Sequence, residues 1–199
     1  MSDEPQKGGY IRQAWLVIIL ALVYGAALAG TQTALGPRIA ENKKNETFHQ
    51  IPMLVEGADS AKTEPVTVKG KDGKDQVVYR ARSADGTFLG WVLPTTGQGF
   101  ADRIDVLIGV NADVTKITGM YVLDQKETPG LGALITEEDF LKQYRGISTD
   151  KPITVVKAEP APGQILAISG ATISSDSVTD IVNKTIENLK EPIRTLDTK

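Results

Sequence analysis

The feature that most constrains this chain is a run from Gln13 to Pro37 that contains no charged residue. Its core, Ala14 to Gly30, is apolar on every side, and about 20 such residues span the hydrocarbon layer of a membrane as a helix. Trp15 would lie at one membrane interface. We therefore expect one transmembrane helix over residues 14–36, after a short N-terminal tail at residues 1–13.

This run has two other interpretations. Ala27-Leu28-Ala29 resembles a signal-peptide cleavage site, but the charge-free run continues past it, which favours a retained anchor. A buried helix of a soluble protein is rarely apolar on all faces. Lys7 and Arg12 precede the run and three basic residues follow it, so counting charges does not decide the orientation.

Composition excludes several kinds of site. The net charge is −3 and the basic residues are scattered, so we expect no nucleic-acid partner. The chain has no cysteine, which excludes disulfides, thiolate metal sites and cysteine nucleophiles. The single histidine, His49, cannot build a multi-histidine metal site, and we expect it on an exposed helix end. We therefore predict neither a metal site nor catalytic residues that act on a substrate.

Patterning predicts an α+β fold, in which helices pack on a twisted antiparallel sheet. Residues 37–75 are expected to form a connecting region, with a polar continuation of the helix to about Asn45 and irregular turns or a loose hairpin over 52–74. Residues 76–199 are expected to form the main domain. Alternating apolar residues predict a meander of four strands, at 76–81, 87–94, 104–110 and 117–123.

The rest of this domain is expected to be mixed. The pattern of apolar residues predicts a helix over 136–144 that buries Phe140, Leu141 and Tyr144. It predicts a further strand over 153–156.

The SGAT motif, Ser169–Thr172, lies between a short apolar strand at 165–168 and an amphipathic helix. Ser174 or Ser175 is the expected N-cap of that helix, and Pro192 its expected end. The N-terminus of a helix presents free N–H groups and positive dipole charge, which suit a phosphate. The alternative is a tight turn before a capped helix.

A second motif, the ETPGLG loop at Glu127–Gly132, follows the predicted meander. Its glycines and proline fix an irregular loop whose backbone can approach a ligand closely. Alone it is more typical of a structural loop. Two such loops in one small domain favour a bound cofactor that carries a phosphate.

Together, the two motifs behind one N-terminal span resemble the FMN-binding domain of the Rnf and Nqr electron-transport complexes. The short chain is most similar to the G subunit of Rnf. The resemblance extends from about Ala14 to Leu189. It implies that a flavin transferase joins FMN to Thr172 by a phosphoester. It assigns cofactor binding to Ser169, Gly170, Ala171, Ile173, Ser174, Glu127, Thr128, Gly130, Leu131 and Gly132.

The resemblance also implies a function and a location. The chain would be a single-pass flavoprotein of the cytoplasmic membrane, in contact with lipid and with other integral-membrane subunits. Its soluble domain would lie on the outer, periplasmic face. It would relay electrons in an ion-translocating ferredoxin:NAD oxidoreductase complex without turning over a substrate of its own.

Two positions depart from the family pattern. Relatives carry an aspartate shortly before the SGAT motif, where this chain has Leu166, and often a histidine where it has Gln125. Noncovalent FMN therefore stays an alternative. So do a protein similar to the C subunit of Nqr, another respiratory FMN-binding subunit, and an anchored interaction module without a cofactor.

Overall fold

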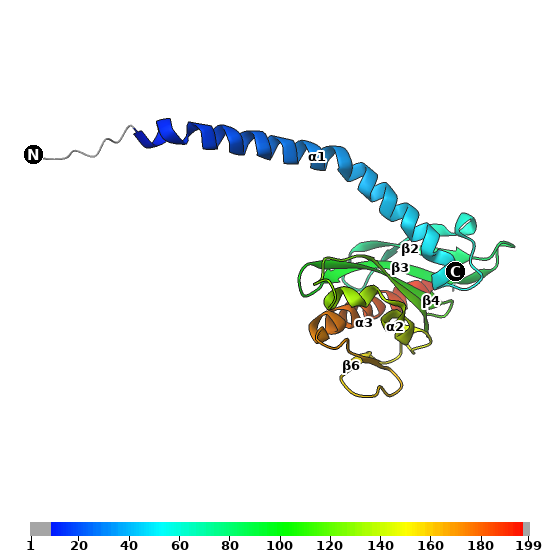
Figure 1. The fold of residues 1–199 in the computed structure, drawn as a ribbon. Helices are drawn as coiled ribbons and strands as arrows, with labels where there is room; N and C mark the ends of the chain where they lie inside the picture. The colour runs from blue at the N-terminus through cyan, green and yellow to red at the C-terminus, as the bar shows by residue number, and fades with distance from the viewer. Residues whose placement is uncertain (1–8, 197–199) are drawn as a thin grey trace, which may run out of the picture. The chain divides into compact units, whose positions relative to one another are not determined.

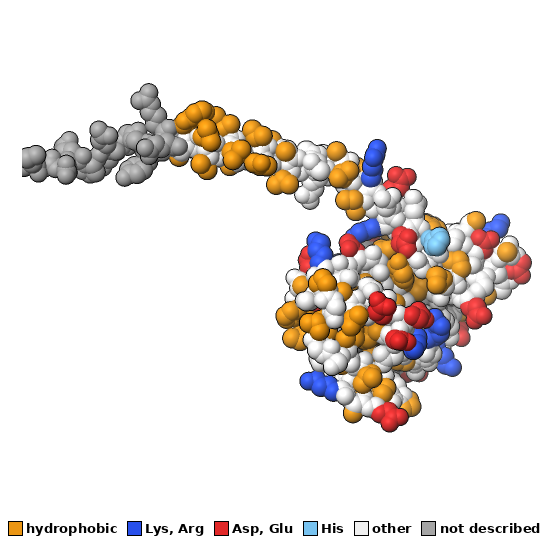
Figure 2. Space-filling model, in the orientation of Figure 1, with side chains coloured by type: hydrophobic (Ala, Val, Ile, Leu, Met, Phe, Trp, Pro, Cys, Tyr) orange, Lys and Arg blue, Asp and Glu red, His pale blue; other side chains and the backbone are white. Residues whose placement is uncertain are grey.

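The computed structural model describes residues 9–196, with side chains from residue 14 onwards. The chain divides into two compact units, Met1–Asn45 and Glu46–Lys199. The first contains most of helix α1 (Gly9–Leu54), and the large apolar side chains of this helix from Trp15 to Ile39 are exposed (Figure 2). Among the described residues, this is the one helix long and apolar enough to cross a membrane. The predicted N-terminal apolar helix is thus confirmed.

The second unit is built on a five-stranded sheet in which every neighbouring pair is antiparallel (Figure 1). The strands follow chain order: β1 (Glu64–Lys69), β2 (Asp75–Arg82), β3 (Phe88–Gln98), β4 (Arg103–Asn111) and β5 (Ile117–Asp124). The α+β class and the four-stranded meander are confirmed. The structure adds β1, which forms a regular hairpin with β2 where the sequence predicted turns or a loose hairpin.

Short elements connect this sheet to the last helix. They are η1 (Ser60–Lys62), η2 (Gly132–Thr136), α2 (Glu138–Leu141), η3 (Lys142–Tyr144), β6 (Thr154–Val156) and β7 (Gln164–Leu166), followed by α3 (Thr172–Leu196). β6 and β7 pair in parallel as a separate sheet. The helix predicted over 136–144 is divided among three short pieces, although Phe140, Leu141 and Tyr144 are buried as expected.

The sheet buries both of its faces. On one face, where Figure 1 shows α2 and α3, Trp91 and Leu93 of β3 join a core that includes Leu189 of α3. On the other face, Val92 of β3 packs with Ile51 from the last turns of α1. Alternation along β3 produces this division, because successive side chains point to opposite faces of a sheet.

A pair of glycines makes room for the end of α1. Gly109 of β4 lies directly opposite Gly119 of β5. A Cβ on Gly109 would lie 2.4 Å from the carbonyl oxygen of Leu54, and the Thr118 hydroxyl donates to that oxygen at 2.5 Å. The backbone of α1 therefore rests directly on the sheet.

Two helices continue through prolines, contrary to prediction. Each proline lacks the N–H that would bond the carbonyl four residues earlier. For Pro52 in α1 that carbonyl is Phe48, which accepts from the Ser60 hydroxyl at 2.5 Å. For Pro192 in α3 it is Asn188, which accepts from the backbone N–H of Lys71 at 3.2 Å. Because distant donors satisfy both carbonyls, α3 runs on to Leu196 and does not end at Pro192.

Candidate functional site

The SGAT motif lies immediately before α3, and Thr172 is the first residue of that helix. Gly170 has φ +79°, a left-handed conformation that glycine adopts without strain. The N-cap prediction was wrong, since Ser174 and Ser175 lie inside the first turn. The Ser175 hydroxyl instead closes the turn: it accepts from the Ile168 N–H and donates to the Ala171 carbonyl, both at 3.0 Å.

The first backbone donors of α3 have no protein acceptor in the part of the chain that the structure describes. The first helical bond runs from the Ser175 N–H to the Ala171 carbonyl at 3.1 Å, and alanine has no side-chain oxygen with which to cap the helix. Within residues 9–196, the N–H groups of Thr172, Ile173 and Ser174 donate to no protein acceptor. Three donors at the positive end of a long helix are an arrangement suited to an anion.

The ETPGLG loop follows β5 and leads into η2. The Thr128 carbonyl accepts from the N–H groups of Leu131 and Ala133, both at 3.1 Å, and Gly130 has φ +74°. Thr128 and Leu131 are exposed, whereas Glu127 is buried, with 4% of its surface accessible. The loop therefore turns one carboxylate inward and leaves its tip at the surface.

The buried carboxylate of Glu127 joins three segments. Its Oε2 accepts from the Ser174 hydroxyl at 2.6 Å, and its Oε1 accepts from the Ala101 N–H, in the β3–β4 turn, at 3.0 Å. No cation among the described residues pairs with it. The positive end of α3, where Ser174 lies, is the nearby partial charge that offsets this carboxylate.

Glycines allow the segments to approach this closely. A Cβ on Gly132 would lie 2.6 Å from the Ser174 hydroxyl, and a Cβ on Gly99 would lie 2.5 Å from Oε1 of Glu127. Real Cβ atoms do not reach such distances. The junction therefore requires glycine at both positions.

A pocket of about 330 Å³ opens where these segments meet. Its lining consists of Phe100, Thr128, Leu131, Gly132, Gly170, Ala171, Thr172, Ile173 and Ser174. Thr172 is half-buried in it, and its side chain makes no hydrogen bond within the described residues. Phe100, Ile173 and Leu131 are 60%, 58% and 44% exposed, so the pocket has an apolar rim.

The structure thus brings the two predicted motifs together, with some differences in detail. Glu127 lies beneath the pocket and does not line it, and Ser169 and Gly130 lie beside it. Phe100 was missed, because an aromatic residue in a short turn carries no pattern of its own. His49 is exposed on α1, as predicted, and no cluster of potential metal ligands occurs in the part of the chain that the structure describes.

Comparison with known proteins identifies the domain that contains this pocket. The family model described as FMN-binding domain matches residues 99–187, a range that includes Phe100, the ETPGLG loop and the SGAT motif.

Two relatives extend the similarity over most of the chain. The G subunit of an ion-translocating oxidoreductase complex from Methanosarcina acetivorans is 33% identical over 178 residues, which is 86% of this chain and 89% of the relative. The G subunit of a Na⁺-translocating ferredoxin:NAD⁺ oxidoreductase complex from Acetobacterium woodii is 30% identical, over 86% of this chain and 87% of the relative. The chain belongs to the family of Rnf complex G subunits.

The fold of this chain is similar to that of a solved Nqr protein. NqrC from Shewanella oneidensis superposes with a TM-score of 0.56 at 23% identity, over 64% of this chain. The match spans 63% of the NqrC chain, somewhat less than two thirds. This likeness shows a shared fold for the sheet and its helices.

Proposed function

We propose that Thr172 carries FMN through a phosphoester, and that the chain is a membrane-anchored electron carrier in an Rnf-type complex. The observation that carries this proposal is the position of Thr172. It is the first residue of α3 and lines the pocket, at a helix end where three N–H groups have no acceptor among residues 9–196.

The helix end fits the phosphate of such a group. A phosphodiester keeps one negative charge, and a helix N-terminus favours such a charge by up to about 1 kcal/mol. The free N–H groups of Thr172, Ile173 and Ser174 supply hydrogen bonds that no protein atom takes up within residues 9–196.

The pocket rim fits an aromatic ring system. Phe100, Leu131 and Ile173 expose apolar surface around Thr172, and exposed apolar clusters commonly mark binding sites. FMN, when bound, supplies the one-electron chemistry, and the protein supplies attachment and surroundings.

The pocket lacks groups for chemistry on a substrate. Its lining residues are apolar side chains, glycines and hydroxyls, none of which titrates near neutral pH. Glu127 accepts hydrogen bonds from beneath the pocket and holds α3 against the ETPGLG loop. The arrangement suits electron relay and not turnover of a substrate.

The relatives support the wider assignment. One is named a subunit of a Na⁺-translocating ferredoxin:NAD⁺ oxidoreductase and another, from Clostridium ljungdahlii, of a proton-translocating one. We propose that this chain likewise joins integral-membrane subunits through an anchor held in lipid, with its soluble unit on the outer face. A flavin transferase would attach the FMN, although the surface-exposed Leu166 stands where relatives carry aspartate.

Fluorescence after denaturing electrophoresis tests the attachment. The chain purified from its own cells should give a flavin band that Thr172→Ala abolishes, while Thr195→Ala, which removes an exposed hydroxyl near the other end of α3, keeps it. Yellow protein that loses all flavin on denaturation would indicate noncovalent FMN. Colourless protein would indicate a cofactor-free module.

The absence of cysteine offers a direct test of orientation. Lys151→Cys introduces a single thiol at an exposed position of the soluble unit. A maleimide that cannot cross membranes should label it in intact cells from which any outer membrane has been opened. Labelling only after lysis would place the soluble unit inside.

A further inference from the structure

The second half of β3 has an open edge. β2 pairs with β3 only where Tyr79–Arg82 lies opposite Phe88–Val92, whereas β4 pairs along Gly90–Gln98. Residues 93–98 therefore have a strand on one side only. In the described part of the chain, no backbone group from elsewhere bonds to this edge.

Pro94 explains why β2 separates here. The Nε2 of Gln76 donates to the Pro94 carbonyl at 3.2 Å, so the backbone of Pro94 faces the β2 side, where it has no N–H to offer a partner. Because alternate residues of an antiparallel strand face the same edge, Thr96 and Gln98 also direct their N–H and C=O groups to the open side.

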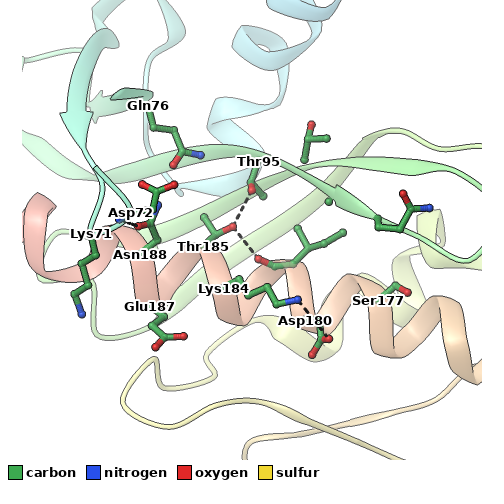
Figure 3. Close-up of a pocket in the computed structure, with 14 residues that line it drawn as sticks. Lys71, Asp72, Gln76, Thr95, Ser177, Asp180, Lys184, Thr185, Glu187 and Asn188 are labelled. Atoms are coloured by element: carbon green, nitrogen blue, oxygen red, sulfur yellow. Dashed lines mark hydrogen bonds and ion pairs between the residues drawn. The ribbon is translucent and has the colours of Figure 1, made fainter. Parts of the chain in front are cut away.

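A groove of about 570 Å³ runs along this edge (Figure 3). Thr95–Gln98 forms one wall, the tip of the β1–β2 hairpin closes one end, and α3 forms the floor. The N–H of Asp72 donates to Oδ1 of Asn188 at 3.0 Å, and the N–H of Lys71 to the Asn188 carbonyl at 3.2 Å. These bonds fix the hairpin tip to α3, away from β3, so the groove is part of the fold.

The polar floor of this groove does not suit binding of lipid or of an apolar helix. Its floor carries the Thr185 hydroxyl, which bonds the Thr95 hydroxyl at 2.8 Å, and the ion pair of Asp180 with Lys184. Figure 3 shows Asp180 and Lys184, which are exposed, and the buried Thr185 along α3. Unpaired N–H and C=O groups on a strand edge are complementary to one kind of ligand, an extended polypeptide.

We propose that an extended segment of a partner subunit adds to β3 as a further strand, and that it bonds the backbone of Thr96 and Gln98. This inference depends on the proposed function in one respect, because it assumes that the chain has partner subunits. Gln98 lies two residues from Phe100, and Ser177, at the same end of the groove, lies one turn after Ile173. The bound segment would therefore end beside the pocket of Thr172.

Two substitutions at one position test the backbone contact. Thr96→Pro removes the edge N–H, whereas Thr96→Ala keeps it, and both lose the side-chain bond to Asp105. Each should be expressed in the whole complex and purified through an affinity tag on this chain. Because Thr96→Pro removes one backbone hydrogen bond to the bound segment, copurified partner subunits should fall roughly fivefold. Thr96→Ala should copurify them as the unmodified chain does.

A photo-crosslinking residue in place of Ser177 tests the occupant without disturbing β3. Crosslinks should map to one continuous segment of another subunit and disappear with Thr96→Pro. Crosslinks confined to a second copy of this chain, no crosslink to any subunit, or equal assembly of the Pro and Ala variants would each overturn the inference. Covalent flavin measured in the same samples separates the two proposals, since its loss with intact assembly contradicts only the proposed function.

Discussion

The hydroxyl of Ser174 donates to Oε2 of Glu127 across 2.6 Å, and this bond ties the first turn of α3 to the ETPGLG loop. The two residues lie 47 positions apart in the sequence. Their contact brings Thr172 and the loop into the lining of one pocket. The geometry of the proposed attachment site therefore depends on a buried carboxylate that does not line the pocket itself.

Replacing Glu127 should destabilise the soluble unit. In Glu127→Ala both the Ala101 N–H and the Ser174 hydroxyl lose their acceptor, at a cost of about 1–3 kcal/mol. Chemical denaturation of the purified chain in detergent measures this. A cycle with Ser174→Ala should give a coupling energy of about 0.5–3 kcal/mol. Additive effects would show that the bond contributes nothing.

Gly132 and Gly130 should respond differently to alanine. Gly130→Ala meets open space and carries only the left-handed backbone cost of about 1–2 kcal/mol. Gly132→Ala would put its Cβ 2.6 Å from the Ser174 hydroxyl and 2.9 Å from Glu127, which forces the junction apart. We expect Gly132→Ala to lower the free energy of unfolding more than Gly130→Ala does. Only Gly132→Ala should also lose covalent flavin. Equal losses in both variants would contradict this account of the junction.

Of the two glycines under α1, Gly109 of β4 should be the more sensitive to an added side chain. Gly109→Ala would place its Cβ 2.4 Å from the Leu54 carbonyl oxygen and should cost about 1–3 kcal/mol through overpacking. Gly119→Ala should cost less, because its nearest atom, the Leu54 Cα, is 3.1 Å away. Thermal unfolding of both variants checks this order, and the reverse order would contradict it.

Stability should fall in strong alkali because of Tyr144. Burial raises the pKa of Tyr144 well above its ordinary 10.0, so the folded state disfavours the phenolate. The contribution of Tyr144 to the free energy of unfolding is then fully present below about pH 10. Above that pH it falls by about 1.4 kcal/mol per pH unit. Tyr144→Phe should make the decline above pH 10 shallower by that amount, as denaturation at a series of alkaline pH values would measure. Burial also raises the pKa of Tyr79 and Tyr121, so part of the decline should remain.

Local patterns were sufficient to predict the meander and the two motifs. Alternation of apolar residues indicates β2 to β5, and the residues of the SGAT motif indicate a turn that leads into a helix. These signals lie within a few residues of each other. The positions of Thr172 and of the ETPGLG loop could therefore be predicted from short stretches of sequence.

The features that were missed depend on distant contacts. α3 continues past Pro192 because Lys71, far away in the sequence, bonds the carbonyl that the proline leaves free. α1 continues past Pro52 because Ser60 does the same for Phe48. Phe100 reaches the pocket only because the β3–β4 turn is tied to Glu127 through Ala101. No local pattern encodes such partners.

Mass spectrometry of the full chain, purified from its own cells and then denatured, tests the central claim most directly. The account predicts an added mass equal to FMN less one water, located on the peptide that contains Thr172. The same peptide at its bare calculated mass, at full occupancy, would contradict it.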